Sequence, residues 1–273
     1  MSEHKALNDW AASHLDLILA NNERLQVSKL RANWALERLN HVRRNLEQSG
    51  INVTFKQGPE EWRINCPFVT HTSITMRKEV GERFGVWQKT IQGAPDMSFD
   101  FLESRTQARK KSNLPYFEKY VISLVVLFWN ILELPDLEDI DRIASQNDTC
   151  TMRTLISVLE AAYYFDDKAL KDATLNTLRS YVKKDGFLLE ESMVVVQGAF
   201  ERVGGPAGQY DLLRKIFLTA AAIQVHALFE LSLRQNNGID NLGRAWKALK
   251  QTPAFSKDWE MAVYWYLTNA SGR

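Results

Sequence analysis

Hydrophobic residues recur at three- and four-residue steps over most of the chain, a spacing typical of amphipathic helices. The first such run extends from Ala6 to about Ala20, and a second extends from about Glu23 to Gln48. Two asparagines separate the runs, and Ser49-Gly50 closes the second in the manner of a helix C-cap. Residues 1–50 are therefore predicted to form a helical hairpin.

The pattern changes after residue 50, where β-branched and aromatic residues begin to alternate with polar ones. Residues 51–55 and 61–65 have this alternation, and the turn residues Gln57-Gly58-Pro59-Glu60 lie between them. Such a pattern predicts a β-hairpin. Two further short strands are predicted at Val86–Ile91 and Met97–Leu102, on either side of the breaker Gly93-Ala94-Pro95.

Helical spacing returns in the rest of the chain. Helices are expected in the later half of 67–84, over 116–132, at about 152–162 and 167–183, and after Leu188 with a break at Gly204–Gly208. The order is therefore helices, a few strands, then helices again. Segregation of this kind predicts an α+β, mostly helical protein and argues against an alternating parallel sheet.

Net charge, cysteine content and the lengths of the apolar runs limit the cellular compartments that fit this chain. The formal net charge is only +1, so the basic surplus of a protein that neutralises many phosphates is missing. The two cysteines, Cys66 and Cys150, are too few and too far apart for a secreted disulfide scaffold. The first residues lack the apolar segment of a signal peptide, and the longest apolar run, 120–132, is too short to span a bilayer. We expect an intracellular protein, nuclear or cytoplasmic, that is neither secreted nor membrane-bound.

No motif that carries chemistry is complete in this sequence. The five histidines are scattered without metal-ligand spacing, and the glycines of 204–208 lack the lysine of a phosphate-binding loop. Cys66 and His71 lie close in sequence, but no orienting carboxylate accompanies them. We therefore predict no catalytic site, no enzyme activity, no cofactor, no metal and no small-molecule substrate.

One basic cluster is present, in a segment that is otherwise almost free of apolar residues. It consists of Arg105, Arg109, Lys110 and Lys111. Without interleaved aromatic residues the cluster does not indicate base stacking, and a solvated loop is the simpler interpretation. The alternative is a helical nucleic-acid-binding protein that uses residues 105–111.

Three stretches carry a family pattern. They are Val53-Thr54-Phe55-Lys56 with the residues up to Ser73, Tyr116–Ile122 leading to Leu134-Pro135, and Thr154–Ala173. Together they resemble the BTB/POZ domain, in particular the divergent BTB proteins of filamentous fungi. The third stretch, TLISVLEAAYYFDDKALKDA, is the most specific, since it is similar to the last two helices of that family. Trp129-Asn130-Ile131 replaces the tyrosine turn of the family.

The resemblance implies a BTB/POZ-like core at residues 51–184, a short hairpin and sheet covered by helices, with the helical hairpin 1–50 before it and a helical extension at 185–273. It further implies a non-catalytic protein-protein interaction scaffold or adaptor, acting by self-association as a homodimer or by recruiting a partner. A cullin-type ubiquitin ligase and a nuclear regulatory complex are the partners that such relatives suggest.

Two candidate partner-binding surfaces follow. Relatives contact cullins through a hydrophobic-x-Glu triplet after the central helix, and Ile131 and Glu133 occupy the outer positions of such a triplet. The second candidate is the apolar stripe of the hairpin, formed by Leu36, Leu39, Val42 and Leu46. Packing of this stripe against the chain's own core is the simpler interpretation.

Overall fold

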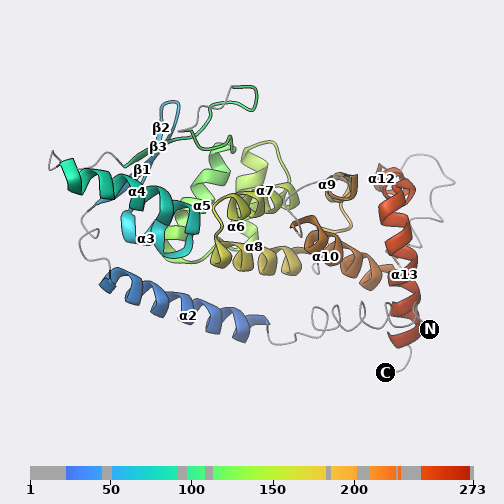
Figure 1. The fold of residues 1–273 in the computed structure, drawn as a ribbon. Helices are drawn as coiled ribbons and strands as arrows, with labels where there is room; N and C mark the ends of the chain where they lie inside the picture. Colours follow the sequence, from blue (N-terminus) through green and yellow to red (C-terminus); the bar gives the residue numbers. More distant parts are fainter. Residues whose placement is uncertain are drawn as a thin grey trace. The chain divides into compact units, whose positions relative to one another are not determined.

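The computed structural model describes residues 23–44, 51–90, 97–107, 113–182, 186–201, 209–225, 227–228 and 241–270. As predicted, it is mostly helical with one small sheet (Figure 1). The chain divides into two compact units, residues 24–177 and residues 1–23 together with 178–273. The division falls inside α8, and the predicted boundaries after residues 50 and 184 stay predictions.

The unit of residues 24–177 contains three strands and most of the helices. In chain order they are α2 (Glu23–Arg44), β1 (Asn52–Gln57), β2 (Glu60–Asn65), α3 (Cys66–Thr72), α4 (Ile74–Thr90), β3 (Ser98–Asp100), α5 (Lys119–Ile131), α6 (Leu137–Gln146), α7 (Thr151–Tyr164) and α8 (Lys168–Tyr181). The first half of the predicted N-terminal hairpin lies outside the described residues.

The sheet has the strand order β2-β1-β3. Strands β1 and β2 form the predicted hairpin, with Val53 opposite Ile64, and Gly58 adopts a φ of 58° at the turn. Strand β3, inside the predicted strand at 97–102, pairs with β1 in parallel. The inward-facing side chains of the hairpin, Val53, Phe55 and Ile64, are at most 2% exposed, and α3 and α5 pack against these strands.

The strand predicted at Val86–Ile91 is wrong, because α4 continues through it to Thr90. Helix is also present over the whole of residues 67–84 apart from Ser73, and not only over the later half. The aromatic and β-branched residues near Val86 favour a strand locally. Once a helix has started, however, each further residue adds a hydrogen bond at little entropic cost, and Met76 and Val80 already bury one face of α4.

Aromatic rings fill the centre of this unit. The ring centroids of Trp129 on α5 lie 5.4 Å from Phe55 on β1 and 5.0 Å from Phe165 after α7. Phe101 lies 6.4 Å from Phe165 with the rings nearly perpendicular. Edge-to-face pairs of this kind add to the stabilisation from burial alone. The core therefore joins the sheet, the central helix α5 and the predicted helix pair α7–α8.

The second unit contains the helices expected after Leu188: α9 (Glu190–Glu201), α10 (Gln209–Ile223), α12 (Asn241–Gln251) and α13 (Pro253–Ala270). Phe255 is fully buried, and its ring centroid lies 5.1 Å from that of Phe200 and 5.8 Å from that of Trp246. The predicted break at 204–208 lies outside the described residues. Among the described helices, none combines the length and the apolar character needed to cross a bilayer.

Candidate interaction surfaces

The central helix α5 is buried except along one stripe. Ser123, Leu127 and Ile131 lie at steps of four residues, so they share a face, and Leu127 and Ile131 are 38% and 49% exposed. Phe128 and Trp129, which follow Leu127 on the helix, are at most 1% exposed. An exposed apolar pair on an otherwise buried helix is a surface at which a protein partner would gain burial.

The triplet predicted for partner binding begins at the last residue of this helix. Leu132 takes the left-handed conformation with a φ of 57°, and its N–H donates to the carbonyl of Phe128. Its side chain is 4% exposed, whereas Ile131 and Glu133 on either side are exposed. The turn therefore presents the two residues named from the sequence and buries the one between them.

Helix α2 has two different faces. Trp34, Arg38 and His41 follow each other at steps of four and three residues and pack toward the rest of the unit. Leu36 and Leu39 point the other way and are 59% and 47% exposed. The interpretation that the apolar stripe packs against the chain's own core is therefore wrong for these two residues. The Val42 side chain and Leu46 lie outside the described residues.

Arg38 attaches α2 to the end of α5. Its guanidinium donates from Nη1 to the carbonyl of Asn130 at 2.8 Å and from Nη2 to the carbonyl of Trp129 at 2.5 Å, and it lies 4.7 Å above the ring of Phe68. The last carbonyls of a helix have no partner within it, so a cation here satisfies them and also meets the negative end of the helix dipole. Burial lowers the pKa of Arg38 to about 10, partly offset by Asp167. The side chain remains charged at neutral pH.

A second contact joins α2 to α3. The Thr70 hydroxyl donates to the carbonyl of Cys66 at 3.0 Å, which leaves its oxygen to accept from Nε2 of His41 at 2.9 Å. The ring centroid of His71 lies 5.7 Å from that of His41, and His71 is 8% exposed. Arg77 on α4 donates to the carbonyls of Thr70 and His71. Two imidazoles and two guanidinium groups therefore lie close together where α2 meets α3 and α5.

One buried carboxylate lies beneath this region. Asp167 is 1% exposed, and its Oδ1 accepts from the N–H of Leu170 in the first turn of α8. Its Oδ2 accepts from the indole N–H of Trp129. Burial raises the pKa of the Asp167 carboxyl above its ordinary value, and these donors offset only part of the rise. The residue caps α8 and fixes the central helix at the same time.

The basic segment is described only in part. Arg105 is exposed, lies 5.7 Å from the ring of Tyr116 and 3.7 Å from a carboxylate oxygen of Glu118. Arg109, Lys110 and Lys111 lie outside the described residues. The structure therefore places one of the four basic residues predicted for nucleic-acid contact, and that residue has an acidic neighbour.

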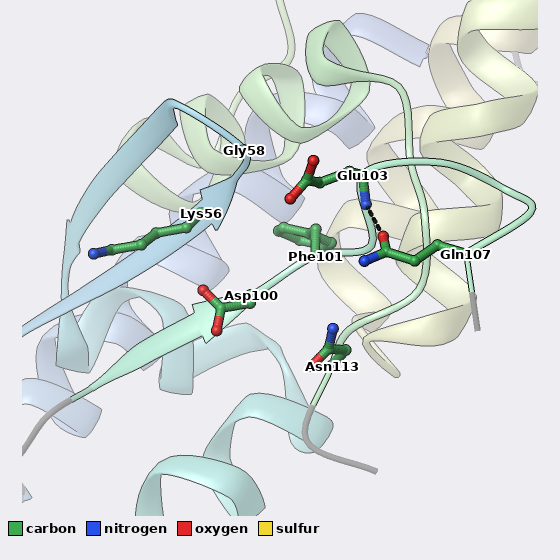
Figure 2. Close-up of a pocket in the computed structure, with 7 residues that line it drawn as sticks. All are labelled: Lys56, Gly58, Asp100, Phe101, Glu103, Gln107 and Asn113. Carbon is green, nitrogen blue, oxygen red and sulfur yellow. Dashed lines mark hydrogen bonds between the residues drawn. The ribbon is translucent and has the colours of Figure 1, made fainter. Parts of the chain in front are cut away.

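A polar hollow of about 280 Å³ lies beside this segment (Figure 2). Its lining comes from β1, β3 and the chain that follows, and consists of Lys56, Gly58, Asp100, Phe101, Glu103, Gln107 and Asn113. In Figure 2 the Lys56 chain points away from the hollow, in keeping with its ion pair to Glu61 at 3.1 Å. The backbone N–H of Glu103 donates to Oε1 of Gln107 at 2.7 Å. Such a lining is typical of a solvated depression in the surface.

Cys66 is fully buried, and burial raises the pKa of its thiol to about 11, so it stays protonated and is a poor nucleophile at neutral pH. Among the described residues, no three histidine, cysteine or acidic side chains gather closely enough to hold a metal ion.

Sequence reasoning missed several residues of these surfaces. Leu127 could have been found, because it precedes Ile131 by one helical turn and therefore shares its face. Arg38 and His41 could not, since charged and polar residues on a helix ordinarily indicate its solvent side.

Comparison of the chain with protein-family models, with curated proteins and with solved structures gave no significant match. The surfaces described above therefore have to be interpreted from their own geometry.

Proposed function

We propose that the chain is a non-catalytic adaptor of BTB/POZ type, which recruits a protein partner through the exposed stripe of α5 and the turn after it. The residues that carry the contact are Leu127, Ile131 and Glu133. The observation that supports the proposal most strongly is the exposure of Leu127 and Ile131 on a helix whose other apolar side chains are buried.

The order of elements is a second support. A hairpin is followed by the helix pair α3–α4, a third strand, the central helix α5 and the pair α7–α8. The BTB/POZ resemblance implies a hairpin and small sheet covered by helices, with these last two helices as its most specific part. In that family the triplet after the central helix contacts a cullin-type ubiquitin ligase, so this is the partner class we expect.

The test is a substitution that changes the surface and not the core. Ile131→Lys puts a charge at the centre of the proposed contact, whereas Ile74→Lys makes the same change at a residue of α4 that is 54% exposed. The 273-residue chain is used as bait in native extract, and cross-linked partners are quantified by mass spectrometry. Wild type and Ile74→Lys should recover the same stoichiometric partner, and Ile131→Lys should lose it.

Light scattering on the same three proteins covers the self-association form of the proposal. A strictly monomeric wild type without a stoichiometric partner, or a partner that binds Ile131→Lys as well as wild type, contradicts the adaptor role.

Leu36→Lys and Leu39→Lys test the outer face of α2 as the second surface. Because both leucines are exposed, each variant should stay within about 0.5 kcal/mol of the wild-type stability.

A further inference from the structure

The contact between α2 and the rest of its unit is unusually rich in positive charge. From α2 come Arg38, His41 and Arg44, from α3 comes His71, and from α4 comes Arg77. One carboxylate, Asp167, acts electrostatically on Arg38 from below. The hydrogen bonds of Arg38 and Arg77 described above go to backbone carbonyls. Among the described residues, carbonyl oxygens and the single carboxylate of Asp167 offset the charges of these two guanidinium groups, so the contact tolerates further positive charge poorly.

The two imidazoles are the groups that can add that charge. Burial and, to a smaller extent, the charges of Arg38, His41 and Arg77 together lower the pKa of His71 to about 4. Burial also lowers the pKa of His41, and Arg77 and Arg44 act in the same direction. The Nδ1 atom of His71 has no hydrogen-bond partner among the described residues, so no acceptor there favours a protonated ring. At neutral pH both rings are therefore uncharged while α2 is docked.

We propose that α2 is a pH-sensitive clasp, docked on α3 and α5 at neutral pH and released from them when His41 and His71 take up protons. The inference rests on the geometry of this contact and does not depend on the adaptor role. The bond from His41 to Thr70 survives protonation, because Nε2 is already the donor in it. Repulsion from the neighbouring guanidinium groups is therefore what releases the helix.

The sign of the effect follows from linkage. A histidine whose pKa is lower in the docked state binds its proton more readily when α2 is released. Docking is then at full strength above the ordinary histidine pKa of about 6.5 and weakens as the pH falls toward the docked value.

Release would uncover the surface that α2 now covers. The ring of Trp34 lies 6.1 Å from that of Phe128, and Arg38 lies over Phe68. Without α2 both phenylalanines lose a covering side chain, and the last carbonyls of α5 lose Arg38. Acid would therefore change the surroundings of the turn at Ile131 while the aromatic core around Phe165 stays packed.

Amide hydrogen exchange of the full chain tests the proposal at about pH 7.5 and about pH 5, with protection corrected for the intrinsic pH dependence of exchange. Peptides from residues 32–44 report α2, and peptides from α7 report global stability. Protection of α2 should fall on the order of tenfold at the lower pH, while α7 keeps its protection. Equal protection of α2 at both pH values, or parallel loss in α2 and α7, overturns the proposal.

Variants identify the groups responsible. His41→Gln keeps a donor toward Thr70 without a titratable ring, so its α2 should lose less protection at the lower pH than the α2 of wild type, with His71 left as the titrating ring. Asn40→Gln, at an exposed position of the same helix, is the control and should behave as wild type. An acid loss in His41→Gln as large as in wild type refutes the proposal. If α2 of His41→Gln is unprotected even at neutral pH, the decisive variant is Arg44→Gln. This variant removes a positive charge from an exposed position, so its α2 must lose protection at a lower pH than the α2 of wild type.

Discussion

The indole nitrogen of Trp129 lies 2.9 Å from Oδ2 of Asp167, and this hydrogen bond joins two residues 38 positions apart in the chain. It connects the central helix α5 to the N-terminus of α8. The same carboxylate caps α8 through its other oxygen. Removal of either partner would leave a polar group unpaired in the core, which costs more than an ordinary surface hydrogen bond.

Asp167→Ala should therefore destabilise the chain by about 2–4 kcal/mol, since it removes a helix cap and leaves the Trp129 N–H unpaired. Urea unfolding followed by circular dichroism measures the change. Asp136→Ala is the matched control, because Asp136 caps α6 from an exposed position and accepts from the N–H of Asp139. It should cost about 1 kcal/mol. Equal costs for the two variants would mean that the Trp129 bond contributes nothing.

The raised pKa of Asp167 predicts a pH dependence of stability. A carboxyl whose pKa is higher in the folded state contributes stability that is complete below its unfolded value and is lost as the pH rises through the folded one. Asp167→Asn removes this titration and keeps the shape of the side chain. Relative to Asp167→Asn, wild type should gain stability as the pH falls from about 7 to about 4. A difference between the two proteins that is constant over this range contradicts the prediction.

Arg38→Met should loosen α2 by about 1–3 kcal/mol, because it leaves the carbonyls of Trp129 and Asn130 without their donor and keeps most of the apolar stem. Arg38→Lys should recover part of this loss, since an ammonium can meet one carbonyl but lacks the planar fork. The local opening free energy from hydrogen exchange in α2 is the measurement. Arg44→Met, at an exposed position of the same helix, should change it by less than about 0.5 kcal/mol.

Two glycines of the second unit predict opposite effects of the same substitution. A Cβ at Gly186 would lie 2.6 Å from the ring of Tyr181, so Gly186→Ala should cost about 1–3 kcal/mol. At Gly198, inside α9, a Cβ would meet nothing within 4 Å. Gly198→Ala should stabilise by up to about 1 kcal/mol, because alanine is the better helix former. Thermal unfolding of both variants tests the pair, and equal melting temperatures would contradict this packing around Tyr181.

The sequence was informative where the pattern of apolar residues sets the structure directly. Alternation at 51–65 predicted the hairpin, and the spacing of Leu155, Val158, Leu159 and Ala162 predicted α7. All of these α7 residues are at most 1% exposed. Periodicity succeeds in these segments because each has one buried face.

Prediction failed where a distant contact or the growth of a neighbouring element decides the outcome. The strand predicted near Val86 became the end of α4, since helix propagation outweighs a local strand preference. The parallel pairing of β3 with β1 joins segments more than forty residues apart and has no local signal. The role of Arg38 was not predicted for the same reason, because only the carbonyls at the end of α5 explain why this cation faces the rest of its unit.

The side chain of Gln57 has a consequence for the segment after β3. Its buried amide nitrogen donates to the carbonyl of Leu102 at 2.8 Å and to that of Phe117 at 2.9 Å, so it holds the two ends of this segment to β1. Leu114, inside this segment, is also buried and accepts from the N–H of Leu102, so it is the exposed stretch near Thr106 whose length is uncoupled from the packing of the core. Doubling such a loop costs only about 0.6 kcal/mol in closure entropy. A peptide or reporter inserted near Thr106 should therefore leave the strand pairing of the sheet unchanged.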